Sequence, residues 1–308
     1  MAEEIRSYVL DRNYHFIHKE ALGDSDFGLD SRLELIEGGF GIYSSSRVRD
    51  RIGPLKSEFF RVAICLDGEV TVECGLEQFR HRRHTIHFNF PSQLFSLHDK
   101  TPDMRSYYML FTPEFLEGLM PLNDLQGRFE FLDYAGVPFF QLDEGEAGQV
   151  IGFFEAIDAE IKSGRPHLKA AIQSYLHLIL ITAQRSYLRQ QLGPELHATR
   201  NSSLLLRFKK LVSQHFREVR GVGDYASRLA VTPNHLSKAI KESSGKTPGD
   251  FIDDMVLVEA KALLRYSEST ISEIAYQLNF SDPSHFNKFF KKMAALTPSQ
   301  YRLKSLAG

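Results

Sequence analysis

The chain has 308 residues, of which 43% are hydrophobic and 25% charged, so it is long and apolar enough to form about two folded domains. Its two cysteines, Cys65 and Cys74, exclude a disulfide framework and favour a reducing compartment. The start has no signal-peptide pattern, and the longest apolar run, Tyr175–Ala183, is far shorter than the roughly 18 residues of a membrane helix, so we expect a cytoplasmic protein.

The net charge of −2 hides an asymmetry between two parts of the chain. From Leu204 to Gly308 there are 16 Lys and Arg residues against 10 Asp and Glu residues, a net charge of +6, whereas the rest has 21 basic and 29 acidic residues. This asymmetry indicates that the basic part meets a polyanion, although +6 is also common on a solvated helical surface.

Short strands are predicted from about residue 10 to residue 112. The runs "FFRVAICL" and "GEVTVECG" are rich in β-forming residues, and Asp67-Gly68 between them predicts a β-hairpin. "HTIHFNFP" and "SYYMLFTP" are further runs that each end at a proline. Evenly spaced strands separated by Gly, Asp and Pro favour an antiparallel barrel or sandwich.

Two helices are predicted next, over about residues 149–191, with a break at "SGRP", Ser163–Pro166. The second helix, from His167 to about Gln191, has apolar residues alternately four and three positions apart. This spacing predicts a dimerisation seam, formed by Leu168, Ile172, Tyr175 and Ile179. The alternative is that one wide apolar face packs inside a single domain.

The expected organisation is a domain at 1–192, a polar linker at 193–203 ("GPELHATRNSS") and a helical domain at 204–308. In the helical domain four capping residues precede a proline, which predicts helix starts at Thr232, Thr247, Asp282 and Thr297. Thr270 and Glu273 add a capping box.

The helical domain contains an internal repeat. "TPNHLSKAIKE" (Thr232–Glu242) matches "DPSHFNKFFKK" (Asp282–Lys292) at an offset of 50, and Ala226 and Leu229 match Ala275 and Leu278 at an offset of 49. One extra turn residue accounts for the difference. Each copy predicts a short helix, a tight turn and a second capped helix, which is the helix-turn-helix layout.

The second helix of each copy has an apolar side and a polar side when it is drawn at 100° per residue. The polar side carries donors that contact base edges or phosphates, and no carboxylate near its centre. The residues predicted to bind DNA are Asn234, His235, Ser237, Lys238, Lys241, Ser284, His285, Asn287, Lys288 and Lys291. A solvated face of a helical bundle is the alternative, but two equivalent helices in a basic domain favour DNA.

The segment between the copies, Pro248–Tyr266, is apolar at helical spacing. A helix of that length extends about 28 Å. Such a spacer would hold the two second helices near one turn of duplex DNA apart, about 34 Å, so that both enter successive major grooves.

These motifs resemble the AraC/XylS family of bacterial transcription regulators. The resemblance covers about Leu204–Arg302, and "ISEIAYQLNFSDPSHFNKFFKKMAALTPSQYR" (Ile271–Arg302) carries the most specific part of it. Asn279 and Ala295 stand where the family usually has glycine. The resemblance implies seven helices with a long connecting helix, base contacts from the second helices, and a cupin-like N-terminal sensor. The expected fold is therefore α+β: an N-terminal antiparallel β-barrel with helices, and a C-terminal all-α tandem helix-turn-helix domain.

Three observations concern a possible ligand of the N-terminal domain. Arg47 and Arg49 alternate on one face of an extended segment, and Arg61 lies in an apolar strand, so these arginines are candidates for binding an anionic effector. Surface ion pairs explain them equally well. In "HRRHTIH", His84 would face away from His81 and His87 on one strand, which favours a solvated basic edge over a metal site.

The sequence predicts a transcription regulator that binds promoter DNA as a homodimer, acts as an activator through RNA polymerase, and takes a small-molecule effector in the N-terminal barrel. An enzyme fused to a DNA anchor is the alternative from another class. It would need clustered His and Glu metal ligands, and the chain has no G-x-S-x-G, Walker A or H-E-x-x-H motif. An architectural DNA binder is the third candidate. No catalytic residue, metal or cofactor is predicted.

Overall fold

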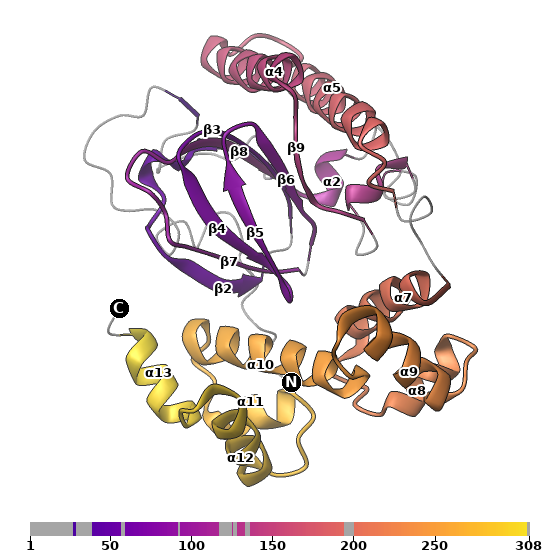
Figure 1. Ribbon diagram of the computed structural model, residues 1–308. Helices are drawn as coiled ribbons and strands as arrows, with labels where there is room; N and C mark the ends of the chain where they lie inside the picture. The colour runs from indigo at the N-terminus through magenta and orange to yellow at the C-terminus, as the bar shows by residue number, and fades with distance from the viewer. Residues whose placement is uncertain are drawn as a thin grey trace. The chain divides into compact units, whose positions relative to one another are not determined.

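The computed structural model describes residues 27–28, 39–56, 59–91, 93–116, 125, 128–132, 136–193 and 200–306 (Figure 1). The chain divides into a β-rich unit, formed by Tyr8–Ile52 and Ser57–Leu196, and a second unit formed mainly by His197–Gly308. The predicted strands before Phe40 lie largely outside the described residues. In the part of the chain that is described, no helix is long and apolar enough to cross a membrane.

The described strands form two sheets. The five-stranded sheet has the order β1-β8-β3-β6-β9, with β1 at Phe40–Ser44, β8 at Arg105–Phe111, β3 at Phe60–Asp67, β6 at Thr85–Asn89 and β9 at Phe139–Gln141. The four-stranded sheet has the order β2-β7-β4-β5, with β2 at Ile52–Lys56, β7 at Leu94–His98, β4 at Glu69–Cys74 and β5 at Glu77–Arg82. The antiparallel pairing is confirmed, but the described strands form two sheets and no closed barrel.

Short helical segments connect these strands. A 3-10 turn, η1, spans Ser45–Arg47, and α2 (Pro113–Leu116) and a second 3-10 turn, η2 (Glu130–Leu132), follow β8. The aromatic rings of the unit gather here: Phe131 lies 4.2 Å from Phe88 and 5.6 Å from Tyr187, measured between ring centroids. The core of the unit therefore continues from the five-stranded sheet to the helices that follow it.

Asp67-Gly68 does not form the predicted hairpin, and that prediction is wrong. Strand β3 pairs with β6 and β8, whereas β4 pairs with β5 and β7, so these two residues turn the chain from one sheet into the other. Gly68 has a φ of 64°, and a Cβ there would lie 2.5 Å from the backbone nitrogen of Met104. The glycine is required by a close backbone approach and a left-handed conformation.

Two long helices complete the β-rich unit: α4 (Glu144–Ser163) and α5 (Leu168–Arg189), which pack side by side near the five-stranded sheet (Figure 1). Asp143 caps α4, and a capping box with Glu146 starts the helix earlier than the predicted residue 149. Glu146 also accepts hydrogen bonds from both terminal guanidinium nitrogens of Arg189, at 2.5 and 2.8 Å, which ties the start of α4 to the end of α5.

The predicted dimerisation seam on α5 is wrong at two of its four positions. Ile172 and Ile179 have 0% exposure and pack inside the unit, while Leu168 and Tyr175 are half-buried. The side of α5 that carries Ile172 and Ile179 therefore packs within one domain, as the alternative prediction stated. Leu178 and Leu188 lie on the opposite side and are 42% and 54% exposed.

The second unit consists of seven described helices: α7 (Arg200–His215), α8 (Val222–Arg228), α9 (Pro233–Ser244), α10 (Pro248–Tyr266), α11 (Ile271–Gln277), α12 (Pro283–Ala294) and α13 (Pro298–Leu306). The resemblance to the AraC/XylS family implied seven helices. Arg200–Ser203 are helical, so the predicted linker is wrong at its last four residues, and residues 194–199 lie outside the described part.

The helix starts follow the predicted capping residues. Thr232, Thr247 and Thr270 accept hydrogen bonds from the backbone nitrogens three residues later, and Asp282 accepts one from the nitrogen of Ser284 at 2.6 Å. Thr297 likewise accepts a hydrogen bond from the nitrogen of Gln300, at 3.3 Å. These bonds satisfy backbone donors that lack a partner at a helix start.

The repeat also extends to the backbone. The turn before each second helix has one left-handed residue, Ala230 in the first copy and Asn279 in the second, 49 positions apart. The end of each second helix has another, Gly245 and Ala295, 50 positions apart. Both spacings match the offsets in the sequence, so Asn279 and Ala295 adopt the conformation that glycine adopts most easily.

Candidate DNA-binding surface and ligand cavity

The two second helices of the repeat, α9 and α12, each bury one side in the helical unit. Leu236, Ala239 and Ile240 on α9 are at most 1% exposed, and Phe286 and Phe290 on α12 are fully buried. The residues predicted to bind DNA lie on the other sides. Eight of them are exposed, and Ser237 and Asn287 are half-buried. The structure thus gathers each predicted set on one solvent-facing side of its helix.

Several of these polar side chains already make local contacts. The Nζ of Lys238 lies 3.9 Å from a carboxylate oxygen of Glu242, and Asn287 donates to the carbonyl of Pro283 at 2.9 Å. Ser284 donates from its hydroxyl to Asp282, and the Nδ1 of His285 lies 3.3 Å from the Oγ of Ser281. These bonds hold the side chains near the helix surface. On contact with a base, the side chains would exchange these bonds for hydrogen bonds to DNA.

The connecting helix α10 lies between the two copies and packs against α7, α9, α11, α12 and α13 (Figure 1). Its fully buried Glu259 accepts a hydrogen bond from Arg217, which follows α7 and is about one third exposed. Arg220 extends the contact to the second copy, because its guanidinium donates to the carbonyl of Leu278 at 2.7 Å and lies 4.6 Å from the Phe280 ring centroid. Charged side chains therefore fix α7 to α10 and to the second helix-turn-helix unit.

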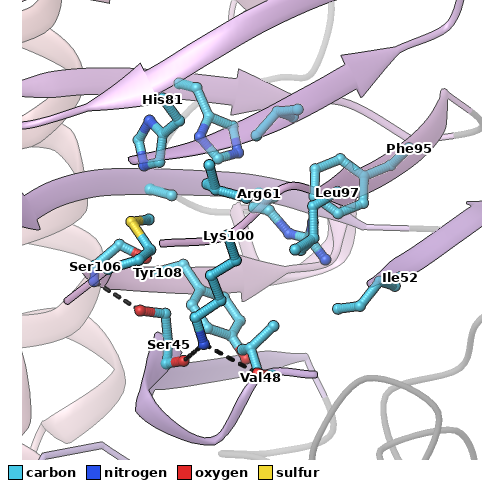
Figure 2. Close-up of a pocket in the computed structure, with 15 residues that line it drawn as sticks. Ser45, Val48, Ile52, Arg61, His81, Phe95, Leu97, Lys100, Ser106 and Tyr108 are labelled. Carbon is cyan, nitrogen blue, oxygen red and sulfur yellow. Dashed lines mark hydrogen bonds between the residues drawn. The ribbon is translucent and has the colours of Figure 1, made fainter. Parts of the chain in front are cut away.

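A cavity lies between the two sheets of the β-rich unit (Figure 2). It has about 50 Å³ of room for the centres of water molecules. Its polar lining residues are Ser45, Arg61, His81, His87, Lys100, Ser106 and Tyr108. Apolar side chains such as Val70, Val72 and Leu97 form the rest of the wall.

Two cationic side chains reach this cavity. Arg61 is 6% exposed, and its guanidinium carbon lies 3.9 Å from the centroid of the Phe95 ring and 5.7 Å from that of Tyr108. Lys100 donates to the carbonyls of Ser45 and Val48, both at 3.1 Å, as the dashed lines in Figure 2 show. Of the arginines predicted to bind an effector, only Arg61 lines the cavity. Lys100 was missed, because no pattern in the sequence links it to Arg61.

The other two predicted arginines do not line this cavity. Arg47 ends the 3-10 turn η1, so the segment is not the regular extended strand that we expected, and its side chain lies outside the described part. Arg49 follows it and is exposed to solvent. The predicted common arginine face is therefore wrong, because η1 turns the backbone between the two positions.

The prediction of a solvated histidine edge is also wrong. His84 occupies a turn with a φ of 63°, so "HRRHTIH" is not one strand but the end of β5, a turn and the start of β6. His81 and His87 therefore point to the same side and are 1% and 4% exposed. Their ring centroids are 4.6 Å apart, and the His87 ring stacks on Phe139 at 4.6 Å.

Burial determines the protonation of this histidine pair. It lowers the pKa of His81 to about 3. Burial, His81 and Arg61 together hold the pKa of His87 well below its usual value, while the nearby Asn89 amide acts weakly in the opposite direction. Both rings are therefore neutral near pH 7, each with one donor nitrogen and one acceptor nitrogen. The described residues contain no group of three or more side chains placed to hold a metal ion.

The histidine pair predicts that the β-rich unit loses stability in acid. The folded-state pKa of His81 is about 3 and the unfolded value is 6.5, so between these values the unfolded chain binds more protons and the free energy of unfolding falls as pH falls. From pH 6.5 to pH 5 His81 contributes a loss of about 2 kcal/mol, and the lowered pKa of His87 acts in the same direction. Urea unfolding at both pH values should show a clearly smaller loss in the double variant His81→Leu, His87→Leu. Equal losses in both proteins would contradict the assignment.

Comparisons with known proteins bear on the helical unit. Residues 225–304 match the family model described as a helix-turn-helix domain. Over 105 residues the chain is 29% identical to the HTH-type transcriptional activator RhaS of Salmonella schwarzengrund, strain CVM19633, a match that covers 34% of this chain and 38% of that protein. The chain therefore spans well under half of this relative's length.

Two solved structures are also similar. The C-terminal domain of AraT, a response regulator from Geobacillus stearothermophilus, is 28% identical over 34% of this chain and 88% of its own, with a TM-score of 0.33. ToxT from Vibrio cholerae is 16% identical over 86% of this chain and 98% of its own, with a TM-score of 0.42. The matched family model reaches from α8 to α13, and the C-terminal unit of this chain thus contains a helix-turn-helix domain.

Proposed function

We propose that this protein is a transcription regulator that binds promoter DNA through α9 and α12 and acts in the cytoplasm. The observation that carries the proposal is the repeated arrangement of these helices. Each has a buried apolar side and a solvent-facing side with Asn, Ser, His and Lys, and each follows the turn of a helix-turn-helix unit. Recognition helices of this motif enter the major groove of DNA.

The geometry of the helical unit supports simultaneous contact by both helices. The connecting helix α10 has 19 residues, a length of about 28 Å. It packs against α9 and α12, and the bond from Arg217 to the buried Glu259 carboxylate ties it to the segment that follows α7. Since one turn of duplex DNA is about 34 Å, we propose that the two helices enter successive major grooves on one side of the duplex.

The two surfaces differ in the residues offered to the bases. Asn234 and Ser237 on α9 correspond to Ser284 and Asn287 on α12, whereas His and Lys occupy the same positions in both. Because different donors and acceptors recognise different base edges, we propose that the two half-sites have different sequences. Lys241 and Lys291, further along each helix, are assigned to phosphates.

We further propose that the regulator acts as an activator by contacting RNA polymerase and has no enzymatic activity. RhaS, with which the helical domain shares 29% identity, is an HTH-type transcriptional activator. In the described part of the β-rich unit, no cluster of His, Cys, Asp or Glu is placed to hold a metal ion. Its cysteines are buried and their pKa values are raised to about 12 by burial, so neither thiol is a nucleophile near neutral pH.

A homodimer is also part of the proposal, through the exposed side of α5 rather than the predicted seam. Leu178 and Leu188 lie on one side of this helix and are large exposed hydrophobic residues. The double variant Leu178→Glu, Leu188→Glu should shift a dimer to a monomer in analytical ultracentrifugation, because two charges oppose burial of this face. Gln149→Glu, at an exposed position of α4, is the charge control. A mass unchanged by the leucine variant would contradict this interface.

Selection of binding sites from a random DNA pool with the full chain tests the proposed function. The expected result is one enriched motif with two unlike elements about one helical turn, roughly 10 base pairs, apart. Equal affinity for the enriched pool and the starting pool would overturn specific recognition and favour an architectural DNA binder.

A further inference from the structure

The cavity between the two sheets contains polar groups that the fold does not satisfy. Neither ring nitrogen of His81 has a hydrogen-bond partner among the described residues, and those of His87 have none of good geometry, with only the Asn89 amide nearby, although both side chains are buried and line the cavity. A buried polar group without a hydrogen bond is costly, and native structures rarely leave one without a reason. These nitrogens therefore indicate a bound molecule that supplies a partner to at least one nitrogen of each histidine.

The charge of the cavity restricts the kind of molecule. Arg61 and Lys100 bring two cations to it, and none of the described residues that line it is acidic. The Arg61 guanidinium lies against the Phe95 ring inside the unit, where a low dielectric strengthens its attraction for an anion. Burial of both histidines keeps their rings neutral, so they offer hydrogen bonds without adding charge. A single negative charge with a neutral polar group matches this set.

The size and the apolar wall restrict the rest of the molecule. Room for the centres of water molecules is about 50 Å³, and one water needs roughly 10–15 Å³, which gives space for about four waters. Because bonded atoms lie closer together than waters do, this space accommodates a small molecule with somewhat more than four non-hydrogen atoms. Val70, Val72 and Leu97 face this space and suit a short hydrocarbon body.

We propose that this cavity binds a small hydroxylated monocarboxylate. Its carboxylate lies beside Arg61 and Lys100. Its hydroxyl group donates to the acceptor nitrogen of one of the two histidines and accepts from the N–H of the other. Its hydrocarbon part contacts the aliphatic wall. Only the consequence of binding, control of transcription, rests on the proposed function. Binding of the molecule itself requires no DNA.

Isothermal titration calorimetry of the full chain without DNA tests the ligand class with three matched compounds. These are 3-hydroxybutyrate, butyrate, which lacks the hydroxyl group, and 1,3-butanediol, which lacks the charge. The first should bind with one molecule per chain, and each of the other two should bind at least about tenfold more weakly, because each leaves buried polar or charged groups without a partner. Equal binding of all three, tighter binding of the diol, or no binding of 3-hydroxybutyrate would overturn the proposal.

The variant His81→Leu separates a ligand-binding role from a structural one. If His81 serves the ligand, its removal should weaken binding of 3-hydroxybutyrate about tenfold or more. It should also raise the Tm of the ligand-free protein by a few degrees, roughly 2–4 °C, because an unsatisfied buried polar group is replaced by an apolar one. A lower Tm with unchanged affinity would show that the histidine is structural and would overturn the proposal.

Two further measurements complete the test. Arg61→Met should remove discrimination between 3-hydroxybutyrate and 1,3-butanediol, since the apolar side chain keeps the packing on Phe95 without the charge. His84→Asn, in the turn between β5 and β6, is the control and should leave the affinity unchanged, because asparagine tolerates the left-handed backbone at this position. Failure of DNA binding in the site selection would leave these results intact, so the two proposals fail separately.

Discussion

Glu259→Ala is expected to lower the free energy of unfolding of the helical unit by about 1.5–3 kcal/mol, the range for a lost hydrogen bond to a charged group. The carboxylate of Glu259 is fully buried on α10 and accepts a hydrogen bond from Arg217, which is about one third exposed. Removing the carboxylate leaves the Arg217 guanidinium beside an apolar cavity. Because α10 packs against both helix-turn-helix units, we expect the loss to affect the transition of the whole helical unit in urea unfolding.

Two other variants serve as controls for this prediction. Glu242→Ala removes an exposed carboxylate whose ion pair with Lys238, at 3.9 Å, should be worth less than about 1 kcal/mol. The double variant Arg217→Met, Glu259→Leu removes both charges and should recover most of the lost stability, since well-packed apolar residues replace a buried ion pair at little cost. Equal losses for Glu259→Ala and Glu242→Ala would contradict the role assigned to the buried pair.

The double variant Lys238→Ala, Lys288→Ala should produce the largest loss of DNA affinity. These lysines are exposed at equivalent positions of α9 and α12. If both contact bases, each substitution should cost about 1–3 kcal/mol on a specific site, or roughly 5- to 150-fold in Kd. Fluorescence anisotropy with the selected site and with a scrambled duplex measures the loss and its dependence on sequence.

The salt dependence of binding distinguishes base contacts from phosphate contacts. Substitution of a lysine that contacts only a phosphate should weaken binding to all sequences and reduce the slope of log Kd against log salt by about 1. Lys304→Ala, on the exposed part of α13, is the matched control and should leave affinity for the selected site unchanged. Normal affinity of the double variant for that site would remove α9 and α12 from the interface.

The helical unit was predictable because its signals are local. Capping residues such as Thr232 and Asp282 act on backbone groups two or three residues away, so their effect depends little on the rest of the chain. The repeat adds an internal comparison: the change of offset from 49 to 50 is reproduced by the left-handed residues Asn279 and Ala295 and their equivalents. The buried sides of α9 and α12 follow from helical periodicity.

The β-rich unit was predicted less well because its arrangement depends on distant contacts. Asp67-Gly68 has the composition of a hairpin turn, but β3 pairs with β8 and β6, so the turn connects two sheets. The turn at His84 places His81 and His87 on the same side, and only the packing of β5 and β6 against Phe139 shows that both are buried. Periodicity on α5 predicted an apolar face, but it could not show whether that face packs inside the unit or meets a second chain.

Chemical footprinting of the full chain on its selected site tests most directly whether α9 and α12 enter successive major grooves. Two protected major-groove segments are expected on one side of the duplex, with centres about 10 base pairs apart. Lys238→Ala should weaken protection at one segment, and Lys288→Ala at the other. A single protected segment, or loss of the same segment in both variants, would contradict insertion of the two helices into successive grooves.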